Sequence, residues 1–127
     1  MCNDVHTMKM LINNYFGCLL LVLLASSRAF ASETVEVDLF IENHKFTPEI
    51  LELPEGRKIR ITVHNKDATI EEFESIDLKR EKIIFGNSKA RVILPPLKEG
   101  EYKFFGEFHE DTAQGKIIVK KNRDQDV

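Results

Sequence analysis

The sequence predicts an all-β fold, a Greek-key β-sandwich of about seven strands, and three observations lead to that prediction. Apolar and polar residues alternate strictly in residues 35–42 and again in residues 58–65, which is the pattern of half-buried strands. Turn-forming residues recur at intervals of roughly 8–14 residues. No stretch after residue 31 shows a long apolar repeat of helical period. Short strands at such spacing are typical of a sandwich.

The first half of the domain contains three predicted strands. Residues 35–42 place apolar side chains on one side and mostly acidic ones on the other. Residues 46–53 form an extended segment in which Pro48 marks an edge or a bulge. Residues 58–65 alternate again, and His64 falls on the outer face of that strand.

The middle of the chain is less regular. Residues 70–75 form a short segment with three acids, and the charged residues 77–82 predict a loop or a single helical turn. Residues 83–85 are apolar, and residues 90–94 predict a strand that Pro95 ends.

The C-terminal part predicts a hairpin, with strands before His109 and after Gly115. Gly100 suits a turn, and the Tyr102 hydroxyl, two residues later, is expected to bond backbone across the corner that follows Pro96. Alternation assigns one set of side chains to the core and the other to the outside. The core set is Tyr102, Phe104, Gly106 and Phe108, and the outer set is Lys103, Phe105, Glu107 and His109.

Residues 1–31 have the pattern of a signal peptide, which leaves residues 32–127 as the mature domain. Lys9 supplies a positive flank, residues 16–25 are a ten-residue apolar run, and Ala29-Phe30-Ala31 is a cleavage site. Either Met1 or Met8 could be the start. A membrane-spanning helix needs about 20 apolar residues, so we expect a periplasmic protein with no membrane insertion after cleavage.

Composition excludes several classes of function. The formal net charge of −3 argues against nucleic-acid binding, which favours a clustered basic face. Every cysteine and methionine lies before the cleavage site, at positions 1, 2, 8, 10 and 18. The mature domain therefore has no disulfide, no thiol nucleophile and no sulfur ligand, and a blue-copper site of the His₂Cys type cannot be built. No hydrolase motif is present, and we do not expect an enzyme.

An ordered set of short motifs resembles the cupredoxin family across residues 35–120. The set comprises an F-x-P segment at 46–48, a Leu-Pro-x-Gly turn at 53–56, a strand ending in Asn65-x-Asp67, and the hairpin pattern Leu-x-x-Gly-x-Tyr-x-Phe-x-x-x-x-His at 97–109. In copper-binding cupredoxins the final loop carries Cys, His and Met ligands. Gly106 stands where the resemblance implies Cys, Ala113 stands near the Met position, and His109 alone is kept.

Two segments are similar to one group within that family. Residues 71–75, EEFES, and residues 104–115, FFGEFHEDTAQG, resemble the periplasmic cupredoxin-like proteins of bacterial ferrous-iron uptake, the EfeO-type domain and its stand-alone relatives. The resemblance implies handling of copper or iron, electron transfer, or at most an accessory part in Fe(II) oxidation. It implies as partners a periplasmic iron-binding protein and a high-affinity iron permease.

The same resemblance places a metal site at one pole of the sandwich. Glu71, or Glu72 after a one-residue shift, falls near the first His ligand of the family, and these carboxylates are expected to converge with His109. Asp111 is a further candidate ligand. Carboxylates suit iron or manganese, and imidazole suits copper as well. Two alternatives remain open: a metal-free docking module that uses Phe105 and the acidic pole, and an electron carrier with copper in an unusual site.

Overall fold

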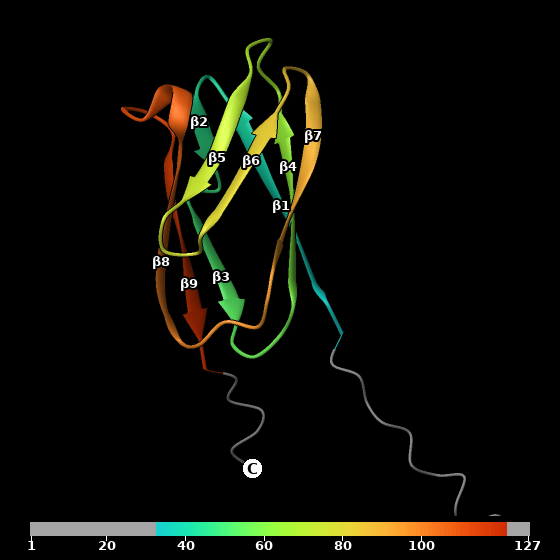
Figure 1. The fold of residues 1–127 in the computed structure, drawn as a ribbon, viewed down its shortest axis with the longest axis vertical. Helices are drawn as coiled ribbons and strands as arrows, with labels where there is room; N and C mark the ends of the chain where they lie inside the picture. Colours follow the sequence, from blue (N-terminus) through green and yellow to red (C-terminus); the bar gives the residue numbers. More distant parts are fainter. Residues whose placement is uncertain (1–32, 122–127) are drawn as a thin grey trace, which may run out of the picture. The chain divides into compact units, whose positions relative to one another are not determined.

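The structure is a computed structural model that describes residues 33–121. Nine strands and one 3₁₀ turn follow one another in this part of the chain (Figure 1). They are β1 (Val35–Glu42), β2 (Lys45–Thr47), β3 (Ile50–Pro54), β4 (Ile59–Asn65), β5 (Glu71–Ser75), β6 (Arg80–Ile84), β7 (Ser88–Leu94), β8 (Gly100–Gly106), η1 (Glu107–His109) and β9 (Gln114–Lys120). The predicted signal peptide and its cleavage site lie outside the described residues.

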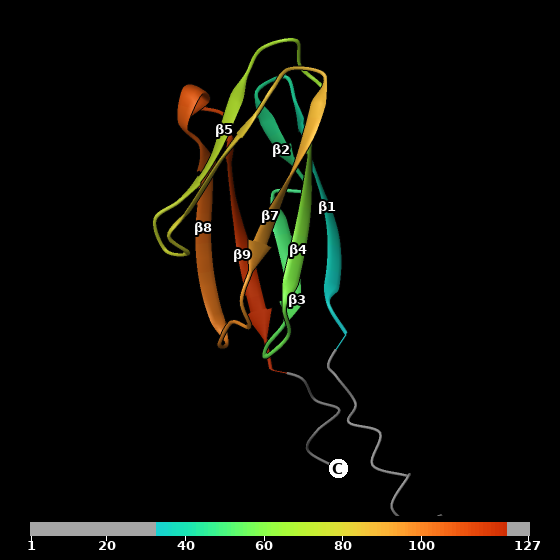
Figure 2. The ribbon, with the colours of Figure 1, turned by 45° about the vertical axis from the view of Figure 1, so that its right-hand side comes forward.

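The strands form two sheets that face each other (Figure 2). One sheet has the order β2-β1-β4-β7, and the other has the order β3-β9-β8-β5-β6. The pairs β1–β4 and β3–β9 are parallel, and all the other pairs are antiparallel. The predicted all-β sandwich is confirmed. No helix in residues 33–121 is long and apolar enough to span a membrane.

The strand count exceeds the expected seven for two reasons. The segment 46–53 divides at Pro48 into β2 and β3, which belong to different sheets. The charged stretch 77–82, expected as a loop or helical turn, instead contains most of β6. A turn before β6 allows this, because Ser75 Oγ accepts a bond from the Leu78 N–H and Lys79 adopts a positive φ of 53°.

Three aromatic side chains hold the two sheets together. Phe46, Phe73 and Phe104 are each at most 1% exposed, and their ring centroids lie 5.0 to 6.3 Å apart. Edge-to-face and offset contacts at such distances add roughly 0.5–1.5 kcal/mol per pair beyond area burial. Phe104 therefore faces the core, as the alternation in the sequence predicted.

The corner predicted at Tyr102 is confirmed. The Tyr102 hydroxyl donates to the carbonyl oxygen of Lys98 at 2.8 Å. The prediction for Phe108 is wrong, since this side chain is 47% exposed. Strand β8 ends at Gly106, and the 3₁₀ turn η1 breaks the two-residue alternation that would have directed Phe108 inward.

Candidate metal centre at one pole

Three segments that are distant in sequence meet at one pole of the sandwich. They are the turn between β1 and β2, the loop between β4 and β5, and η1 with the residues that follow it. In Figure 1 this pole is at the top, where the orange turn of η1 lies beside β2 and the start of β5.

The predicted convergence of Glu71 and His109 is present in the structure. Glu71 Oε2 lies 2.5 Å from His109 Nδ1, although the two residues are 38 positions apart. Glu71 Oε1 accepts bonds from the backbone N–H groups of Phe108 and Glu72, both at 3.0 Å. Glu71 is only 1% exposed, so its carboxylate is buried here with a hydrogen-bond partner for each of its oxygens.

Residue 106 must be small for this arrangement to exist. A Cβ atom on Gly106 would lie 2.7 Å from Glu71 Cδ and 2.7 Å from the Ala113 Cβ. Glu71 therefore fills the space that a side chain at the position resembling the family's Cys would occupy. No cysteine or methionine occurs in residues 33–121. The residues present do not fit a sulfur-ligated copper ion.

His44 is a member of the pole that the sequence analysis missed. Its ring stacks on that of His109, with centroids 3.6 Å apart and an interplanar angle of 15°. Asn43 and His44 have φ values of 53° and 56°, as expected for a two-residue hairpin turn with both central residues left-handed. A histidine at positive φ is uncommon, and this strain was not readable from the sequence.

Asp67 anchors the His44 turn. Its carboxylate accepts bonds from the backbone N–H groups of Asn43 at 2.9 Å and His44 at 3.0 Å. Burial by itself would raise the pKa of Asp67, but the two backbone donors and the imidazoles of His44 and His109 outweigh burial and lower the pKa below its ordinary 3.8. Asn65, 1% exposed, holds the loop by accepting from the Asp67 N–H.

Asp111 lies beside His109 in a shallow hollow of about 460 Å³. The hollow is lined by His44, Glu107, Phe108, His109, Glu110, Asp111 and Thr112. Glu71 does not line it, because its carboxylate is buried in contact with His109 Nδ1. Imidazoles and exposed carboxylates, which bind metals through nitrogen and oxygen, line the hollow. Among the described residues, however, three ligand atoms within 4.8 Å of one another occur at Glu72, Glu74 and Glu81 and not in this hollow.

Glu72 is not part of this pole cluster. Glu71 and Glu72 are neighbours on β5, so their side chains point to opposite faces of the sheet. Glu72 lies on the outer face with Glu74 and Glu81, and ligand oxygens of these three residues fall within 4.8 Å of one another. Burial, followed by the charges of Glu81, Glu107 and Glu72, raises the pKa of Glu74 above its ordinary 4.5.

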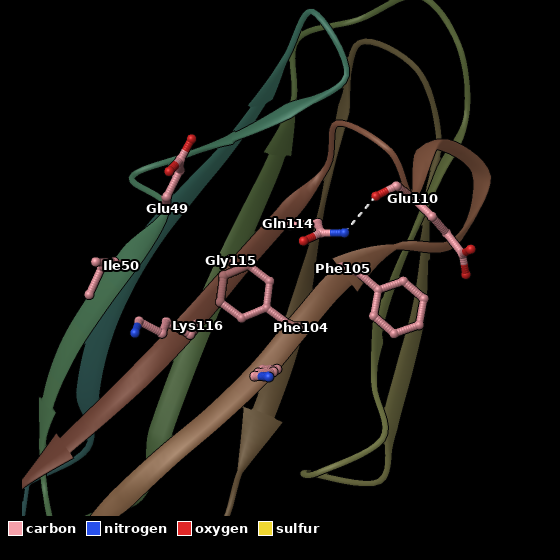
Figure 3. Close-up of a pocket in the computed structure, with 9 residues that line it drawn as sticks. Glu49, Ile50, Phe104, Phe105, Glu110, Gln114, Gly115 and Lys116 are labelled. Atoms are coloured by element: carbon pink, nitrogen blue, oxygen red, sulfur yellow. Dashed lines mark hydrogen bonds between the residues drawn. The ribbon is translucent and has the colours of Figure 1, made fainter.

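A larger hollow of about 560 Å³ lies on the outer face of β9 and β8 (Figure 3). Phe105, Ile50, Lys103 and Lys116 are among the residues that line it. The Gln114 side chain, which also lines it, donates to the Glu110 carbonyl oxygen at 2.9 Å. It contains neither histidine nor a cluster of carboxylates, and we do not assign the metal site to it.

Comparison with known sequences agrees with the fold and adds one relative. The family model described as "Cupredoxin-like domain" matches residues 15–119. The protein RP394 of Rickettsia prowazekii (strain Madrid E), described as uncharacterised, is 56% identical over 85 residues. That alignment covers 67% of this chain and 68% of the relative.

Solved structures with the same fold include a blue copper protein, a purple cupredoxin and a metal-binding domain with Cu(I). Auracyanin A, a "blue" copper protein from Chloroflexus aurantiacus, has a TM-score of 0.60 at 15% identity and covers 69% of this chain and 100% of its own. A purple cupredoxin from Nitrosopumilus maritimus has a TM-score of 0.53 at 21% identity, and the match covers 66% of this chain and 99% of that protein. The metal-binding domain of the Streptococcus pneumoniae D39 Cu(I)-exporting ATPase CopA, with Cu(I), has a TM-score of 0.57 at 16% identity. That match covers 71% of this chain and 98% of the domain. At these identities the likeness concerns the fold alone.

Proposed function

Because this chain belongs to the cupredoxin-like domain family, we propose that it is a periplasmic protein that binds a copper or iron ion at the His109 pole. The fold is one that often binds copper, so it points to metal binding or electron transfer. One contact carries the proposal, the pairing of His109 Nδ1 with the buried Glu71 carboxylate at 2.5 Å. A carboxylate that accepts a hydrogen bond from one nitrogen of an imidazole is a recurring arrangement behind metal-binding histidines.

The biological role that we propose is in ferrous-iron uptake. The similarity of residues 71–75 and 104–115 to the proteins of that pathway supports it, as does the signal-peptide pattern of residues 1–31. A periplasmic iron-binding protein and a high-affinity iron permease would be the partners. N-terminal sequencing of protein from the periplasmic fraction tests export, with a start near Ser32 expected. An intact, membrane-embedded N-terminus would contradict the proposal.

Metal binding is tested by calorimetric titration with Cu(II) and, under anaerobic conditions, with Fe(II). We expect tighter binding of Cu(II), because the divalent affinity series favours copper for nitrogen and oxygen ligands. His109→Ala should lose at least about tenfold in affinity, equivalent to roughly 1.4 kcal/mol. His64→Ala is the matched control, since His64 also contacts a carboxylate, Asp38 at 2.7 Å, but lies outside the pole hollow. A dissociation constant above roughly 100 μM for both metals would overturn the proposal.

A metal-free docking module is the second candidate function. The exposed Phe108 favours it, because this aromatic ring is 47% exposed and flanked by Glu107 and by the acidic residues after His109. If the protein is a metal-free docking module, neither Cu(II) nor Fe(II) binds to it. Phe108→Ser would then weaken binding to the periplasmic iron-binding protein, and His109→Ala would leave that binding unchanged. A redox couple measurable on the copper-loaded protein would instead favour an electron carrier.

A further inference from the structure

The hydrogen bonds of Glu71, together with its burial, keep its carboxylate from reaching a metal ion in the hollow. Oε1 already accepts two backbone N–H groups, and Oε2 is in contact with His109 Nδ1. The residue is 1% exposed and does not line the hollow that contains Asp111. A ligand role for Glu71 would require these contacts to break and would bring an ion into the space beside Gly106, which Glu71 already fills.

The same contact determines which nitrogen of His109 is available. An ionised carboxylate can only accept hydrogen bonds, so in the neutral imidazole Nδ1 must carry the proton that it donates to Glu71 Oε2. The lone pair of the neutral ring is then on Nε2. Of the two ring nitrogens, Nε2 is therefore the one able to ligate a metal.

His44 restricts the orientation of the His109 ring from its other side. The two rings are nearly parallel, 3.6 Å apart, and the His44 backbone is tied to Asp67. The lone pairs of each imidazole lie in the plane of its own ring, and the two planes are stacked face to face. An ion in the plane of the His109 ring therefore lies out of the plane of the His44 ring, where no His44 lone pair points. His44 thus holds His109 in place and is not a second ligand in this geometry.

We infer that a metal ion at this pole is ligated through His109 Nε2, and that Glu71 and His44 act as positioning residues. This inference rests on the proposed function and reverses the expected role of Glu71, which becomes the group that sets the tautomer. His109 lines a hollow that is open to solvent, which gives an ion a path to the ring.

Nuclear magnetic resonance of the histidine-labelled protein tests the inference without any activity assay. In long-range ¹H–¹⁵N spectra of the metal-free protein near neutral pH, we expect His109 as the Nδ1–H tautomer. Addition of Zn(II), a diamagnetic probe, should shift Nε2 and leave Nδ1 protonated. An Nε2–H tautomer in the metal-free protein, or loss of the Nδ1 proton on Zn(II) binding, would overturn it.

Two variants separate positioning from ligation. Glu71→Gln replaces an acceptor-only group by an amide, so the population of the Nδ1–H tautomer should fall. His109→Ala should lose at least about tenfold in Zn(II) affinity. Glu72→Gln changes the neighbouring carboxylate on the opposite face of β5 and is the control, so it should leave the tautomer of His109 unchanged. A tautomer shift of equal size in Glu71→Gln and Glu72→Gln would contradict positioning by Glu71.

Failure of this inference is distinguishable from failure of the proposed function. If neither Zn(II) nor Cu(II) binds the wild-type protein, the proposed function fails, and ligation by Nε2 fails with it. The metal-free spectrum still decides whether Glu71 sets the tautomer of His109. If the metals bind but His109 is metallated at Nδ1, the proposed function stands and this inference is wrong.

Discussion

The Glu71 carboxylate occupies the space into which a side chain on residue 106 would project, and Gly106 is what allows it to be there. The distance from a Cβ at position 106 to Glu71 Cδ would be 2.7 Å, well inside contact distance. One small residue therefore links the loss of a sulfur ligand to the presence of a buried carboxylate. The first prediction follows from this relationship.

Gly106→Ala is expected to destabilise the protein by about 1–3 kcal/mol, the usual cost of overpacking a buried site. Chemical denaturation of wild type and variant measures the effect. The cost should shrink in a Glu71→Ala background, which removes the carboxylate, although the Ala113 contact remains. Additive effects of the two substitutions would show that residues 71 and 106 do not compete for space.

Tyr102→Phe should cost on the order of 1 kcal/mol in the free energy of unfolding. The substitution removes the hydroxyl that bonds the Lys98 carbonyl oxygen at 2.8 Å and leaves the ring in place. Equilibrium denaturation is the measurement. An unchanged denaturation midpoint would show that the bond adds nothing to the corner.

His44→Gly should weaken metal binding without destabilising the fold. The His44 backbone has φ of 56°, which costs a residue with a Cβ roughly 1–2 kcal/mol and costs glycine little. Loss of the stacked ring should leave His109 less restrained, so Cu(II) affinity should fall. Thermal unfolding and Cu(II) titration on the same samples check both parts. A large loss of stability would mean that His44 is mainly structural.

Asp67 should contribute stability that disappears in acid. Its pKa is lower in the folded protein than its ordinary 3.8, so folding favours the ionised form. The contribution is present above the unfolded value and is lost as pH falls through the lowered folded value, below about pH 4. Asp67→Asn should therefore lower stability at neutral pH and make little difference near pH 2. Denaturation curves across that range test the prediction.

Glu74 should show the opposite sign. Burial and three neighbouring carboxylates raise its pKa above 4.5 in the folded protein, so folding favours the neutral form. The ionised Glu74 carboxylate therefore lowers the free energy of unfolding, and this effect appears as pH rises above 4.5 and persists at neutral pH. Glu74→Gln should consequently raise the denaturation midpoint at neutral pH. A lower midpoint would show that the Glu72–Glu74–Glu81 cluster stabilises the sheet.

The sequence alone determined the features that depend on neighbouring residues. Strict alternation in residues 35–42 predicted β1, and the Gly100–Tyr102 spacing predicted the corner that the Tyr102 hydroxyl closes. Strand periodicity and turn chemistry are local, because they arise from backbone geometry over a few residues. The strands of the sandwich could be predicted for that reason, whereas the pole at which His109 lies was predicted from the resemblance to the cupredoxin family.

Tertiary structure decided which side chains meet. The sequence left Glu71 and Glu72 as alternatives, and the register of β5 directs Glu71 to His109 and Glu72 to the opposite face. A shift of one residue exchanges the faces of a strand, so a pattern uncertain by one position cannot identify the buried carboxylate. His44 and His109 are 65 positions apart, and only the path of the chain through two sheets stacks their rings.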